Sequence, residues 1–334
     1  MKSPLPLKGW MLSALVFIAV GSFAHVQWLP IEASATHGVP NFDGPSSIEV
    51  GGETAWVTNT QGNSVFEINS KDGKVIREID GGAYRFSLPF NVAVSDGYVW
   101  VSSVSGDNLT QLNESNGTLV RTENARAFGG VTGIVSANGH LWGTNSAGSE
   151  VVELDTVTGK LIRKFDGSAI QGASSISVIG THIWLDCSKS IVELNISNGS
   201  LVHSFENTSI SGANVFTVKG IHLWVGSIHS VLEFNSSTGA LVRDVHAVID
   251  KIDEPSSIAI DNSDVWIANG GGNSVTEISS TTGALVRVID SEKYRFAAPN
   301  DITIRNSIVW VVNQAGNSVT ELNGSTGAII RVIV

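Results

Sequence analysis

The sequence predicts an all-β protein, a seven-bladed β-propeller with four antiparallel strands in each blade. Three observations support this fold class: a tryptophan recurs at almost constant spacing, the same phrase surrounds each copy, and a glycine precedes the last strand of each phrase. The steps between the tryptophans are 44, 42, 42, 40, 42 and 44 residues. A repeat of about 40–45 residues with four short apolar strands is typical of a propeller blade. The recurring residues are Trp56, Trp100, Trp142, Trp184, Trp224, Trp266 and Trp310.

The sixth copy shows the expected elements in order. An innermost strand covers Pro255–Ile260, the tryptophan strand covers Asp264–Asn269, a third strand covers 273–278, and an outermost strand follows the turn glycine in 283–289. Glycine suits a turn residue with positive φ. Neighbouring blades must cover both faces of each blade, so we expect the indole rings to fill the space between blades. The turn glycines are Gly73, Gly117, Gly159, Gly199, Gly239, Gly283 and Gly327.

Charged side chains recur on the two outer strands. Because a charge repeated in nearly every blade belongs to the framework, we expect Glu–Arg pairing within or between blades rather than acid–base catalysis. The third strand carries Glu67, Glu153, Glu193, Glu233, Glu277 and Glu321, with Gln111 in the second copy. The fourth strand carries Arg77, Arg121, Arg163, Arg243, Arg287 and Arg331, with His203 in the fourth copy.

The repeats extend over residues 42–334, which we expect to form one domain. The first copy begins with its innermost strand and the last copy ends with its outermost strand. No strand is therefore left to be exchanged between the first and last blades, and closure would depend on side-chain packing. The alternative is a clasp strand from residues 25–29.

Composition limits the partners. The formal net charge is −11 and the pI about 5.1, and Lys and Arg form no run outside the extreme N-terminus. Since a nucleic-acid surface needs a basic stripe, we expect no nucleic-acid partner. Cys187 is the single cysteine, so no internal disulfide can form. We expect it to be a buried, inert thiol.

The N-terminus predicts export. Lys2 and Lys8 precede an apolar run, and Ala24 and Ala35 each end a short motif of small residues suited to cleavage. The uncharged stretch is also long enough for a transmembrane helix. We therefore expect residues 1–35 to form a hydrophobic helix, as a signal peptide or as a membrane anchor. Either alternative makes the propeller extracytoplasmic, secreted or membrane-anchored.

Three phrases carry a resemblance to a known group. They are Val309-Trp310-Val311-Val312-Asn313, the run 316–323 (Gly-Asn-Ser-Val-Thr-Glu-Leu-Asn) and the run 282–287 (Thr-Gly-Ala-Leu-Val-Arg). The sequence resembles the YVTN/NHL-type bacterial propellers, which include relatives of a periplasmic DNA-binding propeller and of virginiamycin B lyase. The resemblance covers all seven copies and implies the propeller fold. It also implies a range of functions, from protein, sugar or nucleic-acid binding to metal-assisted lyase or lactonase activity. The lyases bring His and Glu into the central mouth, and no such set can be matched here.

The copies are not equivalent at one end of the ring. The turn between the second and third strands is two residues shorter in the fourth and fifth copies, and the connections to the next blade are longest after the first, fifth and sixth. Both kinds of loop lie at the same end of a propeller. We therefore expect a mouth that is tall over blades 6, 7, 1 and 2 and low over blades 3 to 5.

Two of the long connections share a Tyr-Arg pair that no other copy has, Tyr84-Arg85 and Tyr294-Arg295. Tyrosine and arginine are frequent anchors of interfaces. We expect these four residues to form a recognition rim for a partner, and the alternative is that they brace the ring locally.

Polar residues replace small ones where some innermost strands begin: Asn91, Asn214, Asn300 and Asp301. These side chains are candidate ligand-binding groups in the mouth. A hard cation such as Ca²⁺ is the alternative occupant, but one carboxylate would bind it poorly. His140, His182 and His222 recur two residues before a tryptophan. A shared zinc ion is not expected there, because neighbouring blades are too far apart for Zn–N bonds of about 2.0–2.1 Å. We expect no metal, no cofactor and no catalytic residue.

These observations favour a non-catalytic, monomeric binding scaffold that recognises a protein, peptide or glycan at its loop-rich mouth. The alternative is a metal-assisted lyase or lactonase of the virginiamycin B lyase-like type that uses the central mouth. A purely structural envelope protein is a third hypothesis.

Overall fold

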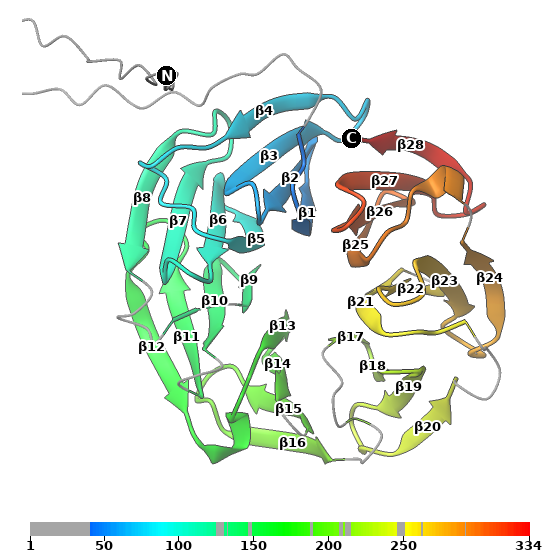
Figure 1. Cartoon of the computed structure of the whole chain (residues 1–334). Coiled ribbons are helices and arrows are strands. Elements are labelled where there is room, and N and C mark those ends of the chain that lie inside the picture. The colour runs from blue at the N-terminus through cyan, green and yellow to red at the C-terminus, as the bar shows by residue number, and fades with distance from the viewer. Residues whose placement is uncertain are drawn as a thin grey trace, which may run out of the picture. The chain divides into compact units, whose positions relative to one another are not determined.

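The computed structural model describes residues 41–124, 130–131, 133–145, 149–187, 190–206, 210, 215–245, 251–261, 263–290 and 292–334. Seven four-stranded sheets follow one another around a ring (Figure 1), and each sheet is made from four consecutive strands paired antiparallel. The strands β1, β5, β9, β13, β17, β21 and β25 surround the centre, and β4, β8, β12, β16, β20, β24 and β28 form the outer edge. The predicted seven-bladed propeller is thus confirmed.

The strand bounds follow the repeat. Blades 1 and 2 contain β1 (Pro45–Gly51), β2 (Thr54–Asn59), β3 (Ser64–Asn69), β4 (Val75–Ile79), β5 (Pro89–Ser95), β6 (Tyr98–Ser103), β7 (Asn108–Asn113) and β8 (Leu119–Asn124). Blades 3 and 4 contain β9 (Gly133–Ala137), β10 (His140–Asn145), β11 (Glu150–Asp155), β12 (Leu161–Asp166), β13 (Ser175–Ile179), β14 (His182–Cys187), β15 (Ser190–Asn195) and β16 (Leu201–Glu206). Blades 5 to 7 contain β17 (Val215–Lys219), β18 (His222–Ser227), β19 (Ser230–Asn235), β20 (Leu241–Asp244), β21 (Pro255–Ile260), β22 (Asp264–Asn269), β23 (Ser274–Ser279), β24 (Leu285–Ile289), β25 (Pro299–Arg305), β26 (Ile308–Asn313), β27 (Ser318–Asn323) and β28 (Ile329–Ile333).

Among the described residues, two short 3₁₀ turns, η2 (Ser168–Ile170) and η4 (Glu292–Tyr294), lie in connections between blades. No helix in the described part of the chain combines the length and apolar character needed to cross a membrane. The predicted N-terminal helix in residues 1–35 and the alternative clasp strand in 25–29 fall outside the described residues. Both stay predictions.

The recurring tryptophans form the core of the seams between blades. Seven apolar clusters are present, and each contains one of these tryptophans with side chains of the following blade. Trp310 of blade 7, for example, packs with Phe42, Ile48 and Phe66 of blade 1. The exposed fraction of every one of the seven indole residues is 3% or less. Each indole therefore contributes its large apolar area to a seam rather than to its own blade.

The predicted Glu–Arg pairs are present in blades 1, 3, 5, 6 and 7, and each lies within one blade. Cross-strand register places Trp56 opposite Glu67 and Glu67 opposite Arg77, and Nε of Arg77 lies 2.9 Å from Oε2 of Glu67. Equivalent pairs join Arg243 to Glu233 (2.6 Å) and Arg287 to Glu277 (2.8 Å). The carboxylates are buried, so the arginine supplies the charge that a buried carboxylate needs.

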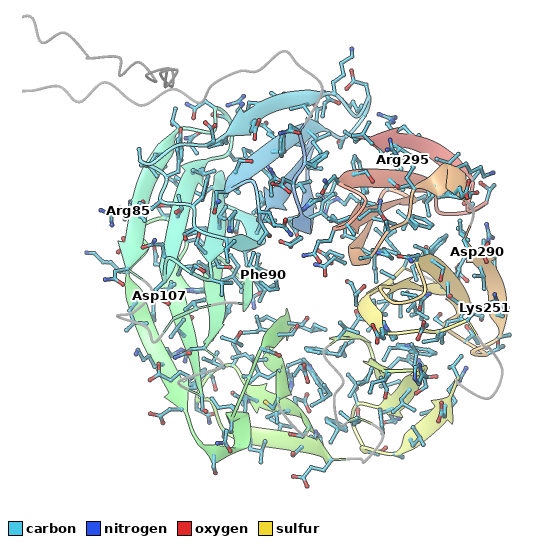
Figure 2. The ribbon with its side chains drawn as sticks, viewed as in Figure 1. Arg85, Phe90, Asp107, Lys251, Asp290 and Arg295 are labelled. Carbon is cyan, nitrogen blue, oxygen red and sulfur yellow. The ribbon has the colours of Figure 1, made fainter. Side chains whose placement is uncertain are left out.

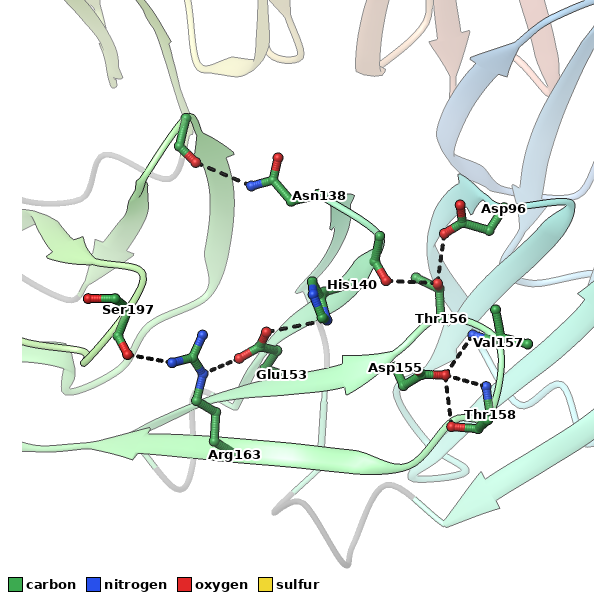
Figure 3. A network of polar contacts seen from close by, with 12 residues as sticks. Asp96, Asn138, His140, Glu153, Asp155, Thr156, Val157, Thr158, Arg163 and Ser197 are labelled. Atoms are coloured by element: carbon green, nitrogen blue, oxygen red, sulfur yellow. Dashed lines mark hydrogen bonds and ion pairs between the residues drawn. The ribbon is translucent and has the colours of Figure 1, made fainter.

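Most of these arginines also bind the next blade. Figure 3 shows the arrangement in blade 3, where Arg163 pairs with Glu153 and donates a hydrogen bond to the carbonyl of Ser197 in blade 4. Equivalent hydrogen bonds connect Arg287 to the carbonyl of Ser325 (3.1 Å) and Arg331 to that of Lys71 (3.0 Å). The acceptors lie in the turns that carry the recurring glycines. Gly283 has a φ of 70°, in the region that favours glycine, and a Cβ there would also come within 2.7 Å of Cδ of Arg243.

Among the described residues, the ring closes without strand exchange. Blade 1 contains only β1–β4 and blade 7 only β25–β28. Besides the cluster around Trp310, three side-chain hydrogen bonds cross this seam near the mouth: Asn317 Oδ1 accepts from the Gly44 amide (2.9 Å), Asp301 Oδ2 accepts from the Ile48 amide (2.9 Å), and Asn300 Nδ2 donates to the Ser46 carbonyl (2.7 Å). The Arg331–Lys71 bond closes the seam at its outer edge. Hydrogen bonds therefore take the place of the peptide connection that joins every other pair of neighbouring blades.

We expect Arg331→Ala to lower the free energy of unfolding by about 2 kcal/mol, because Glu321 would stay buried without its partner. Urea denaturation gives this value. Arg287→Ala is the matched control, since Arg287 makes the same contacts between two blades that are joined through the chain. Proteolysis should increase at the seam between blades 7 and 1 only in the Arg331 variant. Equal stability and equal proteolysis of wild type and Arg331→Ala would show that this tie does not hold the ring closed.

Candidate ligand-binding mouth

The innermost strands begin around a central cavity of about 570 Å³ at one end of the ring. Its lining includes Ser46, Asn91, Ser175, Ser256 and Asn300, together with residues of all seven blades. The cavity is large enough for a small molecule or for part of a larger ligand. Its residues are contributed by strand ends, which are held rigidly by their blades.

Small polar side chains at these strand ends connect neighbouring blades. Ser46 Oγ donates to the Phe90 carbonyl of the next blade (2.9 Å), and Thr144 Oγ1 donates to the Ser174 carbonyl (3.2 Å). Ser257 Oγ lies 2.9 Å from Oδ1 of Asp301. Serine and threonine at these positions therefore have two roles: they bind the neighbouring blade, and they give the cavity a polar lining.

The predicted mouth residues are brought together with one exception. Asn91, Asn300 and Asp301 all line the central cavity, whereas Asn214 lies outside the described residues. Each of the three also binds the next blade: Asn91 Oδ1 accepts from the Ile134 amide (3.3 Å), and Asn300 and Asp301 make the closing bonds described above. Their role in ligand binding stays a prediction, and any ligand would compete with or add to these bonds.

The lining of the mouth is acidic. Its charged residues are Glu254 and Asp301, and no Lys or Arg lines the cavity among the described residues. Burial raises the pKa of Asp301, and its hydrogen bonds with the Ile48 amide and with Ser257 oppose that shift. The pKa of Glu49, on β1, is raised to about 7, first by desolvation and then by the charge of Asp301, while Arg305 opposes the shift. The Glu49 side chain nevertheless keeps an exposed surface. Both shifts favour the neutral carboxyl, so the described lining offers mainly hydrogen-bonding groups to a ligand.

The loops at this end differ between blades as expected. Four residues separate the second and third strands in blades 1, 2, 3, 6 and 7, and two separate them in blades 4 and 5. In the long turns an asparagine holds the following connection: Asn63 Oδ1 accepts from the Leu88 amide (2.8 Å), and Asn273 Oδ1 accepts from the Ala298 amide (2.7 Å). The Asn317–Gly44 bond is the equivalent contact at the closure. The longer loops are therefore braced segments.

The two Tyr-Arg pairs divide into a buried and an exposed part. Tyr84 and Tyr294 are buried and stack on Phe86 and Phe296, with ring centroids 5.6 and 5.5 Å apart. Equivalent threonines donate to the carbonyls of both tyrosines at 2.8 Å. The tyrosines thus hold the long connections against the ring. Local bracing of this kind was the alternative to a recognition rim in the sequence analysis.

The arginines of the two pairs are exposed and share an unusual backbone conformation, with φ of 54° at Arg85 and 55° at Arg295. Figure 2 shows both near the outside of the ring, whereas Phe90 lies toward the channel. Neither arginine lines the central cavity. The predicted rim is therefore a pair of outer positions, and its role in recognition stays a prediction.

Sequence reasoning missed three residues near the mouth. Phe90 and Phe216 add aromatic surface to the lining. Asp186 is buried behind Ser174, whose Oγ lies 3.3 Å from Oδ2 of Asp186, and burial raises the pKa of Asp186 to about 7. The sequence could have singled out Asp186, because blades 1 to 3 have Thr or Ser at the equivalent position and blade 4 has a carboxylate. Burial and the neighbouring Asp186 also raise the pKa of the Cys187 thiol to about 12, so this thiol is inert near neutral pH.

The three recurring histidines bind carboxylates of their own blades. Nδ1 of His140 lies 3.3 Å from Glu153, that of His182 2.9 Å from Glu193, and that of His222 2.5 Å from Glu233. Figure 3 shows the first of these pairs. Across the described residues, no group of three or more His, Cys, Asp or Glu side chains is arranged to hold a metal ion. These histidines therefore add a second basic partner to the buried glutamates of blades 3 to 5, which also bind Arg163, His203 and Arg243.

No protein-family model and no curated protein sequence matches the chain. Solved structures do. A catalytically inactive variant of virginiamycin B lyase from Staphylococcus aureus, with quinupristin, matches with a TM-score of 0.71 and 18% identity, over 86% of this chain and 97% of the lyase chain. Hydrazine synthase from Kuenenia stuttgartiensis matches with a TM-score of 0.71 and 15% identity, over 86% and 97% of the two chains. BamB from Moraxella catarrhalis matches with a TM-score of 0.58 and 15% identity, over 83% and 80%.

These similarities show the β-propeller fold, which an enzyme named as a lyase shares with proteins of other names. The resemblance to YVTN/NHL-type repeats is consistent with the fold, while membership of that group stays a prediction. Function must therefore be argued from the site itself.

Proposed function

We propose that the protein is an extracytoplasmic, non-catalytic binding scaffold that holds a protein, peptide or glycan segment in the central mouth. The observation that carries this proposal is the cavity of about 570 Å³, lined by strand ends of all seven blades. Its serine, asparagine and backbone groups can form hydrogen bonds in several directions, and Phe90 and Phe216 can pack against apolar or sugar-ring surfaces. Placement outside the cytoplasm rests on the N-terminal sequence, and a monomeric state is part of the proposal.

Binding is favoured over catalysis by the chemistry of the lining. The described lining has no histidine or cysteine, and its acids are Glu254 and Asp301. Asp301 already accepts hydrogen bonds from the Ile48 and Ile302 amides. A general base or a nucleophile needs a side chain whose polar atoms are free to reach the reacting group. The mouth therefore supports recognition better than acid–base chemistry.

The test compares variants of the mouth with variants of the outer positions. Ser175→Trp should fill the mouth and reduce binding of peptides and glycans on arrays by at least about tenfold, since the ligand would lose its cavity. Arg85→Ala together with Arg295→Ala should weaken binding if the outer arginines contact the ligand. Circular dichroism would confirm that both variants stay folded. Array binding that is the same in wild type and Ser175→Trp would contradict the proposal.

The second candidate, a lyase, rests on the shared fold alone and is tested in parallel. Incubation with quinupristin, with and without a chelator, and mass spectrometry of the products would reveal turnover. Chelator-sensitive cleavage that is lost in Ser175→Trp would replace the scaffold by an enzyme that uses the same mouth.

A further inference from the structure

A second cavity, of about 310 Å³, lies at the outer edge of the ring between blades 4 and 5. It is lined by His203, Phe205 and Glu206 of β16 and by Phe234, Gly239 and Leu241 of blade 5. Figure 1 shows β16 and the outer strands of blade 5 next to each other at this seam. The cavity lies away from the mouth, and no lining residue is shared between the two.

This seam differs from the others because its arginine is replaced. The arginine of the fourth strand reaches the turn of the next blade in blades 2, 3, 5, 6 and 7, whereas blade 4 has His203 at that position. Nδ1 of His203 binds Glu193 at 2.6 Å within its own blade. The imidazole is shorter than an arginine side chain. Consistently, a Cβ at Gly239 would meet only Phe205, at 3.6 Å, whereas at Gly283 it would meet arginine Cδ at 2.7 Å.

Blade 3 shows what occupies the same space when arginine is present. The guanidinium carbon of Arg163 lies 5.7 Å from the ring centroid of Trp142 and 5.2 Å from that of Phe165. These two rings stack at 6.2 Å. The same guanidinium binds Glu153 and the carbonyl of Ser197 (Figure 3). Aromatic faces, a carboxylate and a turn carbonyl together form a guanidinium site.

Blade 4 retains the two aromatic rings and the turn carbonyl without the guanidinium, and the His203 imidazole lies against Phe205, with ring centroids 5.7 Å apart. Trp184 and Phe205 stack at 5.6 Å with an interplanar angle of 29°, close to the 24° of the pair in blade 3. The Ser237 carbonyl is at the position equivalent to Ser197, two residues before the turn glycine. Glu206 adds a carboxylate at the cavity wall, and the described lining residues include no Lys or Arg. The walls therefore match an aliphatic chain that ends in a delocalised cation.

We propose that the cavity between blades 4 and 5 binds an arginine side chain supplied by a partner protein. The guanidinium enters beside His203 and the edge of Phe205, pairs with Glu206 and donates to the carbonyl of the blade 5 turn. The partner thus completes a contact that five other seams of the ring make with their own arginines. The site is separate from the mouth, so a partner can bind it whether or not the mouth is occupied.

The test uses the full-length protein at pH 8. N-acetyl-arginine-methylamide is titrated into labelled protein, and the NMR signals of the Trp184 indole and the His203 imidazole are followed. We expect saturable shifts, and binding at least about tenfold weaker for the citrulline analogue, which has the same shape without the charge. Equal binding of the two analogues, or no saturable shift, would overturn the proposal.

Two variants locate the site. His203→Arg should abolish the shifts, because the new side chain fills the cavity as Arg163 fills the equivalent space, and the ring should stay folded. Phe205→Leu should weaken binding by removing the aromatic face, which keeps the proposal testable if His203→Arg folds poorly. Ser175→Trp, in the mouth, should leave arginine binding unchanged. Binding that survives both His203→Arg and Phe205→Leu, or that is lost in Ser175→Trp, would place the arginine elsewhere and refute the assignment.

Discussion

Trp310→Ala should lower the free energy of unfolding by about 3–5 kcal/mol, the range for removing a large aromatic side chain from a packed core. The exposed fraction of Trp310 is 1%, and it packs with Phe42 and Ile48 across the only seam of the described ring that no peptide connection joins. The surrounding side chains belong to two blades, so they cannot collapse into the space without moving the blades. Urea denaturation followed by circular dichroism gives the free energy.

Val286→Ala is the matched control, because Val286 lies on an outer strand with an exposed fraction of 44%. This change should alter stability by less than about 0.5 kcal/mol. A loss of less than about 1 kcal/mol in Trp310→Ala would mean that the indoles do not hold the seams, and the account of the ring given above would be wrong.

Asp186→Asn should make the protein more stable at pH 8 by about 3 kcal/mol, although it removes a charged group. Burial raises the pKa of Asp186 from 3.8 to about 7, and no cation compensates its charge among its described contacts. The folded state therefore binds a proton more tightly than the unfolded state does. Stability falls as pH rises from about 4 to about 7 and is then constant, because both states are ionised.

The asparagine variant has no such proton, so its stability should change less over this range. Urea denaturation of both proteins at pH 4.5, 6 and 8 measures the difference. Ser174→Ala is a useful control, because it removes the hydroxyl bound to Asp186 and leaves the carboxyl in place. Identical pH dependence of wild type and Asp186→Asn would show that Asp186 is ionised without cost in the folded protein.

Much of the framework was predictable because it repeats. The spacing of Trp56 and its six equivalents identified the blades, and the recurring Glu and Arg correctly predicted pairs such as Glu277–Arg287. A repeat reveals which positions face a seam, since each copy must satisfy the same neighbours. The turn lengths between the second and third strands were also read correctly from the sequence, while a mouth that is taller over blades 6, 7, 1 and 2 stays a prediction.

The candidate sites were less predictable. Tyr84 and Tyr294 were expected at a recognition rim, but their rings are buried against Phe86 and Phe296. Asn300 and Asp301 were recognised as mouth residues, while their hydrogen bonds to blade 1, more than 250 residues away in the chain, were not. Such contacts depend on the angle at which the blades meet, which no local pattern records.

The sequence alone determined the architecture: the number of blades, the order of strands, the turn glycines and the charge pairs follow from a phrase copied seven times. Only the tertiary structure decided which differences between the copies change the contacts between blades. His203 is one substitution in the sequence, yet in the ring it leaves a cavity lined by residues of two blades. The physical reason is that a seam is formed by two blades at once, so the space left by a missing side chain depends on both surfaces and on how closely they approach.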